Sequence, residues 1–253
     1  MILFFIFVLG LSVGSFLNVI IDRLPNNKSL LGRSHCDFCK KTLKPSNLIP
    51  ILSYFLQGGR CESCRKKLSA QYPTIEMVTG LSFVFTWFQF IHLGLAATIL
   101  YLIVVSIFIA MFVADLKYQI IPDELQLLLF CVSFGLLYLL NNPNLLDYAE
   151  RLVFAFVAMF PLLFLFLITK GKGMGFADVK LTFILGFLFG LKLGFLIIYL
   201  AFISGGIVGF YLLVTGLKKR KSKIAFGPFI ILSAILVLYN QSFIIKLLTE
   251  FLR

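Results

Sequence analysis

Two aspartates stand at the ends of long apolar runs, where a carboxylate is costly to keep. Asp115 follows the run 95–114, and Asp178 precedes the run 179–191. An ionisable residue at a membrane boundary usually has a function. Two carboxylates at one level can share a proton, so that one acts as a base on water while the other acts as an acid on a carbonyl group. We therefore predict that Asp115 and Asp178 form a catalytic aspartyl pair.

Each aspartate also has a simpler interpretation, in which it caps a helix or ends a span at the lipid headgroups. For a single aspartate at such a boundary, that role is the commoner one. The pattern of apolar runs favours catalysis. The run before Asp115 is predicted to cross the membrane toward one face, and the run after Asp178 to cross back from that face, so both aspartates would lie at the same level. The glycines Gly171, Gly173 and Gly175 also leave room for an extended peptide backbone to approach.

Other acidic residues have structural interpretations. Asp123 and Glu124 follow a proline and suit the first turn of a helix, where anions are favourable. Asp123 is also a candidate for a residue that supports the catalytic pair without reacting itself. Glu76 is expected in the first turn of another helix, while Asp147 and Glu150 are expected as solvated residues of an outer loop.

Four of the five cysteines form two Cys-x-x-Cys pairs in the one long polar segment: Cys36, Cys39, Cys61 and Cys64. Such pairs resemble a zinc ribbon or knuckle, and a bound metal would supply folding energy to a small basic loop. A redox role for one pair is the alternative. His35 is a possible substitute ligand but is expected to be a bystander, and Cys131 is expected to be inert within an apolar core.

The composition indicates a polytopic membrane protein. Hydrophobic residues make up 60% of the 253 residues, and they form runs of about twenty that soluble domains lack. The net charge of +12 comes from basic residues clustered between the apolar runs. This distribution indicates membrane topology and contact with anionic membrane lipids, and it argues against a nucleic-acid partner.

We predict an all-α polytopic fold of about eight transmembrane helices, with a small cytoplasmic four-cysteine zinc-binding loop between the first two. The expected spans are 1–21, 73–91, 95–114, 125–140, 152–169, 179–191, 193–216 and 224–239. Three domains follow: the first transmembrane helix at 1–21, the cytoplasmic loop domain at 22–72, and the transmembrane peptidase core at 73–253.

The orientation of the chain follows from its basic residues. With the N-terminus outside, 19 of the 23 Lys and Arg residues fall on the cytoplasmic side, including those of the basic block 218–223. This orientation places Asp115 and Asp178 on the cytoplasmic side at similar depth. The predicted location is therefore a cell membrane that the chain crosses several times.

The motifs resemble those of the type IV prepilin peptidases, over nearly the whole chain. The matching segments are 14–19, 23–25, the four cysteines, 72–73, Glu76, 79–80, Asp115 with 121–123, and 173–181. One position departs from the family's Gly-x-Gly-Asp pattern: Ala177 stands where the second glycine is expected. Alanine would be unsuitable only if that position needed a positive φ. The basic loop also resembles the competence versions of Gram-positive bacteria.

The resemblance implies both a substrate and a second activity. It implies prepilin or pseudopilin partners that are cleaved after a glycine, where the basic leader meets the apolar segment. It also implies that S-adenosylmethionine is used to methylate the new N-terminus, although no residue here identifies the ligands of that methyl donor.

Two other functions compete with the aspartyl peptidase. A small transporter could use Asp115 and Asp178 as proton or cation sites. Such transporters commonly contain internal repeats and broken helices at the midplane, and the sequence shows no convincing repeat. A zinc-bearing membrane scaffold would leave the aspartate motifs unexplained.

Overall fold

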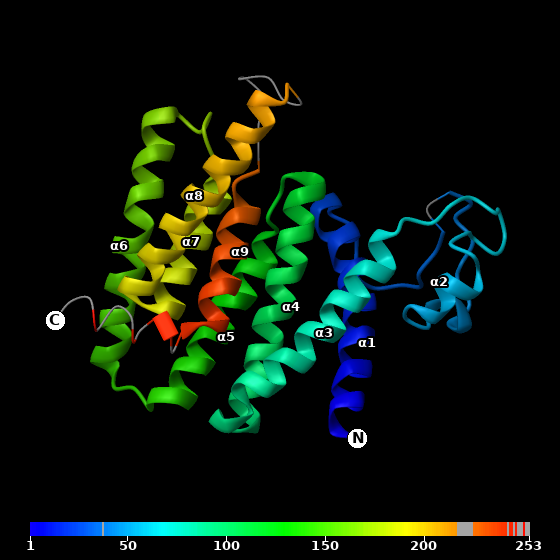
Figure 1. The fold of residues 1–253 in the computed structure, drawn as a ribbon, viewed down its shortest axis with the longest axis horizontal. Helices are drawn as coiled ribbons and strands as arrows, with labels where there is room; N and C mark the ends of the chain where they lie inside the picture. The colour runs from blue at the N-terminus through cyan, green and yellow to red at the C-terminus, as the bar shows by residue number, and fades with distance from the viewer. Residues whose placement is uncertain (37, 217–224, 242, 245, 247–249, 251–253) are drawn as a thin grey trace. The chain divides into compact units, whose positions relative to one another are not determined.

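The structure is a computed structural model that describes residues 1–36, 38–216, 225–241, 243–244, 246 and 250, and in these residues it is helical with no named strand. The long helices are α1 (Ile2–Arg23), α3 (Gln71–Phe90), α4 (Leu95–Tyr118), α5 (Asp123–Asn141), α6 (Leu145–Thr169), α7 (Phe176–Phe189), α8 (Leu191–Val214) and α9 (Gly227–Tyr239) (Figure 1). The all-α prediction is confirmed, as is the position of a four-cysteine loop between the first two long helices.

Each of the eight predicted spans corresponds to one of these helices, and six are long and apolar enough to cross a membrane: α1, α3, α4, α5, α6 and α8. Helices α7 and α9 contain 14 and 13 residues. At 1.5 Å per residue they are about 20 Å long, which is shorter than the roughly 30 Å hydrocarbon core of a bilayer. The predicted basic block 218–223 lies outside the described residues.

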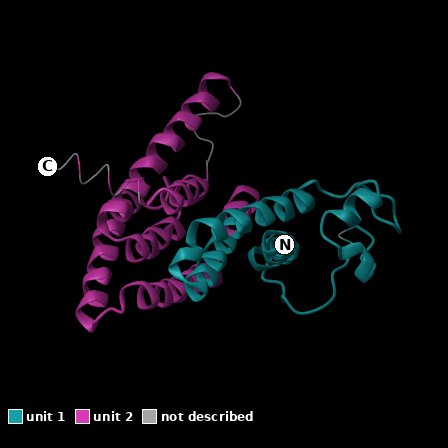
Figure 2. Cartoon of the chain, turned by 60° about the horizontal axis from the view of Figure 1, so that its bottom comes forward, with its two compact units in different colours: residues 1–110 teal, residues 111–253 magenta. Residues whose placement is uncertain are grey.

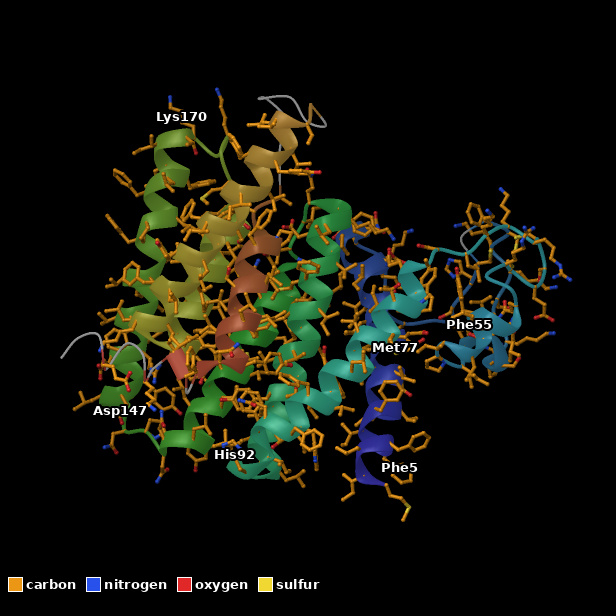
Figure 3. All side chains as sticks on the ribbon, viewed as in Figure 1. Phe5, Phe55, Met77, His92, Asp147 and Lys170 are labelled. Carbon is orange, nitrogen blue, oxygen red and sulfur yellow. The ribbon has the colours of Figure 1, made fainter. Side chains whose placement is uncertain are left out.

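Helix α6 begins earlier than predicted, at Leu145. The Asp147 carboxylate accepts a hydrogen bond from the Asn144 backbone N–H at 2.8 Å, which satisfies a free donor at the helix start. Asp147 and Glu150 therefore belong to the first turns of α6, and the prediction that they lie in a loop is wrong. Asp147 and Lys170 mark the two ends of this helix (Figure 3).

The chain forms two compact units, Met1–Ala110 and Met111–Arg253, coloured separately in Figure 2. In the first unit, α1 and α3 pack through small residues. A Cβ atom on Gly14 would lie 2.7 Å from the Cα of Glu76, and one on Gly10 would lie 2.8 Å from the Cα of Gly80. Glycine at these positions lets the two helix backbones approach closely.

The loop between α1 and α3 has little regular structure. It contains the short helix α2 (Leu52–Leu56), two 3-10 helices, η1 (Leu24–Asn26) and η2 (Pro45–Leu48), and two isolated β-bridges. With so few buried apolar side chains, this loop depends on other interactions to hold its shape.

In the second unit, α7 packs against its neighbours through apolar residues. A Cβ atom on Gly186 would lie 2.7 Å from the Cβ of Ala158, so α6 and α7 are in close contact. Phe187 is fully buried beside Leu137 and Ala155. This packing holds the C-terminal half of α7 in place, and the first turn of the same helix carries one of the two predicted catalytic aspartates.

Candidate active site and metal centre

Asp115 lies in the last turn of α4 and is only 5% exposed. The helix continues to Tyr118 and is followed by Gln119 in the left-handed region, with φ of 55°. Asp115 is therefore held on a regular helix, which fixes its side-chain direction better than a loop would.

Asp178 lies in the first turn of α7 and is 6% exposed. Its Oδ2 accepts a hydrogen bond from the Gly175 backbone N–H at 3.2 Å. The N-terminal end of a helix favours a negative charge, so this position can hold a carboxylate that burial would otherwise disfavour. The helix start thus positions Asp178 and partly compensates its charge.

The second unit brings the two aspartates together, although 63 positions separate them in the sequence. The charge of Asp115 acts on the Asp178 carboxyl, so the two side chains lie within electrostatic reach of each other. Two neighbouring acids in a buried setting cannot both ionise cheaply, so they tend to hold one proton between them. This is the arrangement that an aspartyl hydrolase needs.

Gly227, the first residue of α9, is a residue of this site that the sequence analysis missed. A Cβ atom there would overlap Oδ2 of Asp115 and would lie 2.7 Å from Cδ1 of Ile121. Only glycine lets the start of α9 approach Asp115 this closely. A Gly-Pro pair in a sequence is typical of a helix start, and nothing in the sequence links Gly227 to Asp115.

The structure separates Asp123 from the buried pair. Its side chain is 72% exposed and forms an ion pair with Lys180, two residues after Asp178. Asp123 therefore faces solvent and can steady the first turns of α5 and α7. Asp123 and Glu124 both lie in the first turn of α5, as predicted.

The glycine-rich segment before Asp178 ends α6 and leads into α7. Lys170 and Gly171 both have positive φ, at 49° and 72°, which stops α6. Ala177 lies within the regular helix α7, so its position needs no positive φ. Alanine therefore adopts the backbone conformation at position 177 without strain, although the family pattern has glycine there.

The four cysteines of the first unit form one cluster. All four Sγ atoms lie within 4.8 Å of one another, and those of Cys36 and Cys64 are 3.9 Å apart. Four thiolates around a zinc ion, each with a bond of about 2.3 Å, would be separated by about 3.8 Å. The cluster therefore fits a tetrahedral metal ion with small adjustments.

The two Cys-x-x-Cys turns are near copies of each other. The backbone N–H groups of Cys36 and Cys61 donate to the carbonyls of Lys41 and Lys66, each five residues on. Lys40 and Arg65 occupy equivalent positions with φ of 57° and 59°. Such repeated turns are typical of zinc knuckles.

Backbone N–H groups also prepare the sulfur of Cys61 to bind a metal. The N–H groups of Cys64 and Ser63 donate to it and lower its pKa to about 7. A thiolate is the form that binds zinc, so these N–H groups favour the liganding state at Cys61. Although a backbone N–H group lowers the pKa of Cys64, burial and the neighbouring thiols raise it to about 11, so Cys61 is the first of the two to ionise. His35 is not in the cluster; it pairs with Thr42 across a β-bridge, as expected of a bystander.

Two predictions about buried residues are wrong. Cys131 is exposed on α5, because the buried face of that helix carries Leu125, Leu129 and Val132. Glu76 lies in the interior of α3 rather than in its first turn, and it is 7% exposed. Its Oε2 accepts the Ile51 N–H at 2.7 Å, so Glu76 joins the loop to α3.

Helices that can span a membrane, together with a buried aspartate pair at helix ends, define the class of intramembrane aspartyl hydrolases. Sequence comparison then gives the family. Residues 8–90 match the bacterial peptidase A24 N-terminal domain, and residues 102–210 match the type IV leader peptidase family. The chain belongs to the type IV leader peptidase family.

Curated relatives cover nearly the whole chain. A prepilin leader peptidase/N-methyltransferase of Bacillus subtilis is 34% identical over 94% of this chain and 95% of its own. Proteins of the same name from Pseudomonas aeruginosa and Legionella pneumophila are 31% and 30% identical, over 88% and 91% of this chain and 84% and 88% of their own. No solved structure matches the chain.

Proposed function

We propose that this protein is a prepilin leader peptidase and N-methyltransferase, an enzyme that removes the short leader of type IV prepilins or pseudopilins and methylates the new N-terminus. Its family and its curated relatives support this activity. The observation that carries the peptidase assignment is the buried pair Asp115 and Asp178, brought together at helix ends within one compact unit.

The aspartate pair supplies acid and base for hydrolysis. The ionised member takes a proton from water, while the protonated member donates to the oxygen of the scissile carbonyl. The water oxygen attacks the carbonyl carbon, and the C–N bond then breaks as the nitrogen gains a proton. When Asp178 is the ionised member, the Gly175 N–H and the start of α7 stabilise its charge.

The substrate must present an extended backbone to this pair. A helical peptide bond is shielded by its own hydrogen bonds, and glycine weakens a helix at the point of cleavage. We propose that the cleaved glycine lies at the cytoplasmic edge of the substrate's apolar segment, with the basic leader in the cytoplasm. This requires the pair to face the cytoplasm in the inner membrane, with the N-terminus outside, as the distribution of basic residues predicts.

The four cysteines have a structural role in this proposal. Cys36, Cys39, Cys61 and Cys64 would hold one zinc ion, which supplies folding energy to the loop. All four positions of a tetrahedral ion are then taken by protein ligands, as in structural zinc sites. The three domains predicted from the sequence (1–21, 22–72 and 73–253) remain a proposal for how these functions divide.

The transporter alternative gains no support from the comparisons. The two family matches and the curated relatives are peptidases by name. Broken-helix transporters place their ion sites near the bilayer midplane, whereas the distribution of basic residues predicts that Asp115 and Asp178 lie at the cytoplasmic side.

The direct test uses the full-length protein in detergent with a purified prepilin. Mass spectrometry of the product should show a mature N-terminus that begins after the glycine, with a methyl group when S-adenosylmethionine is present. An intact prepilin after prolonged incubation with folded enzyme would overturn the peptidase assignment.

A further inference from the structure

Gln126 is a buried polar residue of α5 that the proposed hydrolysis by Asp115 and Asp178 does not use. It is only 3% exposed, and neither its amide nitrogen nor its amide oxygen has a hydrogen-bond partner among the described residues. Burying an amide without a partner destabilises a fold. A native protein that keeps such a group therefore calls for an explanation, and a functional role is one.

The contacts between α5 and α7 show which way Gln126 faces. Asp123 forms an ion pair with Lys180 of α7, and the ring of Phe130 lies 5.8 Å from that of Phe183, also on α7. Helical residues three or four positions apart share a face. Gln126 is three positions after Asp123 and four before Phe130. It therefore faces α7, at a level between Lys180 and Phe183.

This level on α7 is close to one catalytic aspartate. Asp178 lies in the first turn of α7, two residues before Lys180 and five before Phe183. At 1.5 Å per residue, these two residues lie about 3 and 7.5 Å beyond Asp178 along the helix axis. Gln126 thus faces α7 within about one and a half turns of Asp178.

The start of α5 also adjoins the other aspartate. A Cβ atom on Gly227 would lie 2.7 Å from Cδ1 of Ile121 and would overlap the Asp115 carboxylate, so Ile121 and Asp115 lie on the same small residue. The N–H of Gln126 donates to the Pro122 carbonyl at 3.3 Å, which places Gln126 on the turn that follows Ile121. Gln126 is therefore carried by a regular turn that begins beside the catalytic pair.

A primary amide is the chemical complement of a peptide group. Its oxygen accepts a hydrogen bond from a backbone N–H, and its nitrogen donates to a backbone carbonyl. In a helix these backbone groups are already paired with each other, whereas an extended segment leaves them free. A substrate that is extended at the aspartates needs new partners for them in apolar surroundings.

We propose that Gln126 is a substrate-binding residue, whose amide pairs with a backbone peptide group of the extended substrate next to the scissile bond. This inference rests on the proposed peptidase activity. Gln126 holds the substrate and takes no part in the proton transfers of the aspartate pair. Because a backbone contact does not depend on side chains, the enzyme can accept substrates that differ in sequence beside the cleaved glycine.

The burial of Gln126 matches that of the residues it would assist. Asp115 and Asp178 are 5% and 6% exposed, so a peptide reaches them only when the surrounding helices separate. Gln126 lies on a helix that borders both aspartates, and the same separation would bring the peptide backbone to its amide.

Gln126→Leu in the full-length protein tests the proposal, because leucine has a similar size but no polar atoms. The KM for prepilin should rise about tenfold while kcat stays within about threefold, since the contact is made before and during the reaction. The midpoint of thermal unfolding should not fall, because the change removes a buried amide without a partner. Gln126→Met is a second apolar replacement, used if the leucine variant does not fold.

Ser133→Ala is the matched control on the same helix. Ser133 is fully buried, but its hydroxyl donates to the Leu129 carbonyl at 2.7 Å and so has a partner within α5. This variant should leave the KM for prepilin unchanged. If Gln126→Leu lowered the unfolding midpoint and left KM unchanged, Gln126 would have a structural role and the proposal would be wrong. A lower kcat with a shifted pH profile would instead show that Gln126 acts through the aspartates, which also contradicts the proposal.

A binding experiment tests the backbone contact directly. Asp115→Asn should bind prepilin without cleaving it, and adding Gln126→Leu should weaken that binding about tenfold. Synthetic prepilins are then used in which one backbone amide near the scissile bond is replaced by an ester, which lacks the N–H. One ester position should weaken binding to Asp115→Asn but have little further effect when Gln126→Leu is also present. Equal effects of every ester in both proteins would refute the pairing.

The outcomes also separate this inference from the proposed function. A folded wild-type enzyme that does not cleave prepilin would refute the peptidase assignment itself. A wild-type enzyme that cleaves prepilin, with a Gln126→Leu variant of unchanged KM, would refute only the role of Gln126.

Discussion

At the scale of single residues, burial distinguishes the acids that can do chemistry from those that cannot. Asp115 and Asp178 are at most 6% exposed, whereas the Asp123 side chain is 72% exposed and paired with Lys180. Burying a carboxylate is costly unless it has partners. Glu76 is also buried, but it supports the Ile51 backbone. The aspartate pair is therefore the acidic site best suited to catalysis among the described residues.

Replacing either aspartate tests the pair. Asp115→Asn or Asp178→Asn should reduce cleavage by roughly 10²–10⁴-fold, because each removes one half of the acid–base function. Asp123→Asn should reduce it much less, since it loses only an exposed ion pair. Cleavage is measured against a prepilin with equal amounts of inserted protein. Near-normal turnover of either single variant of the pair would show that the assignment is wrong.

Gly227 should be nearly as sensitive as the aspartates. In Gly227→Ala the new Cβ would displace the Asp115 carboxylate, and a displacement of about 1 Å can cost about 10²-fold in rate. Gly206→Ala is the matched control in the same unit, because a Cβ there has no neighbour within 4 Å. Cleavage rates of the two variants should differ by at least tenfold. Equal cleavage rates would mean that the Asp115 carboxylate can be displaced without loss of peptidase activity.

At the scale of elements, helix ends build the candidate catalytic site and paired turns build the candidate metal site. Asp115 ends α4, Asp178 begins α7 and Gly227 begins α9. The cysteine turns repeat one backbone pattern, with Lys40 and Arg65 in equivalent left-handed positions. Both sites thus use short stretches of backbone whose geometry is fixed by regular hydrogen bonding.

Removing a cysteine ligand should loosen the loop rather than alter the aspartate pair. The wild type should bind one zinc ion per chain, measured by elemental analysis. Cys39→Ser should lower the zinc content and increase proteolysis within residues 24–70, because the lost ligand removes local folding energy. Cys131→Ser should change neither measurement, since Cys131 lies outside the cluster. Zinc-free wild-type protein with an intact loop would contradict the metal assignment.

At the scale of the whole molecule, the proposed orientation decides which peptide bond can be cut. In the proposed orientation the leader of the substrate and the basic loop of the enzyme would both lie on the cytoplasmic side, because basic residues between apolar runs favour that side. Both carry positive charge and repel each other. Recognition should therefore depend on the position of the substrate's glycine more than on pairing of charges.

Moving the substrate's glycine tests this orientation. A prepilin whose glycine lies one helical turn, about 5.4 Å, deeper in its apolar segment should be cleaved at least tenfold more slowly. Replacing leader lysines with glutamine should have a much smaller effect once the substrate is inserted. Cleavage is measured in proteoliposomes. Efficient cleavage of the deep-glycine substrate would place the aspartate pair nearer the bilayer centre.

The sequence by itself determined the helical class, the order of the eight apolar segments, and the candidate catalytic and metal-binding residues. Long apolar runs indicate membrane-spanning helices, and paired Cys-x-x-Cys spacing constrains a metal site locally, so neither inference needed the fold. The same local reasoning misjudged Cys131 and Glu76, because burial of a helical residue depends on which neighbour covers its face.

Only the tertiary structure decided which distant residues meet. It brought Gly227 against Asp115, turned Asp123 outward to Lys180, and joined Glu76 to Ile51 across the loop. Contacts between residues this far apart depend on how helices pack, so the spacing of residues within a single segment cannot predict them.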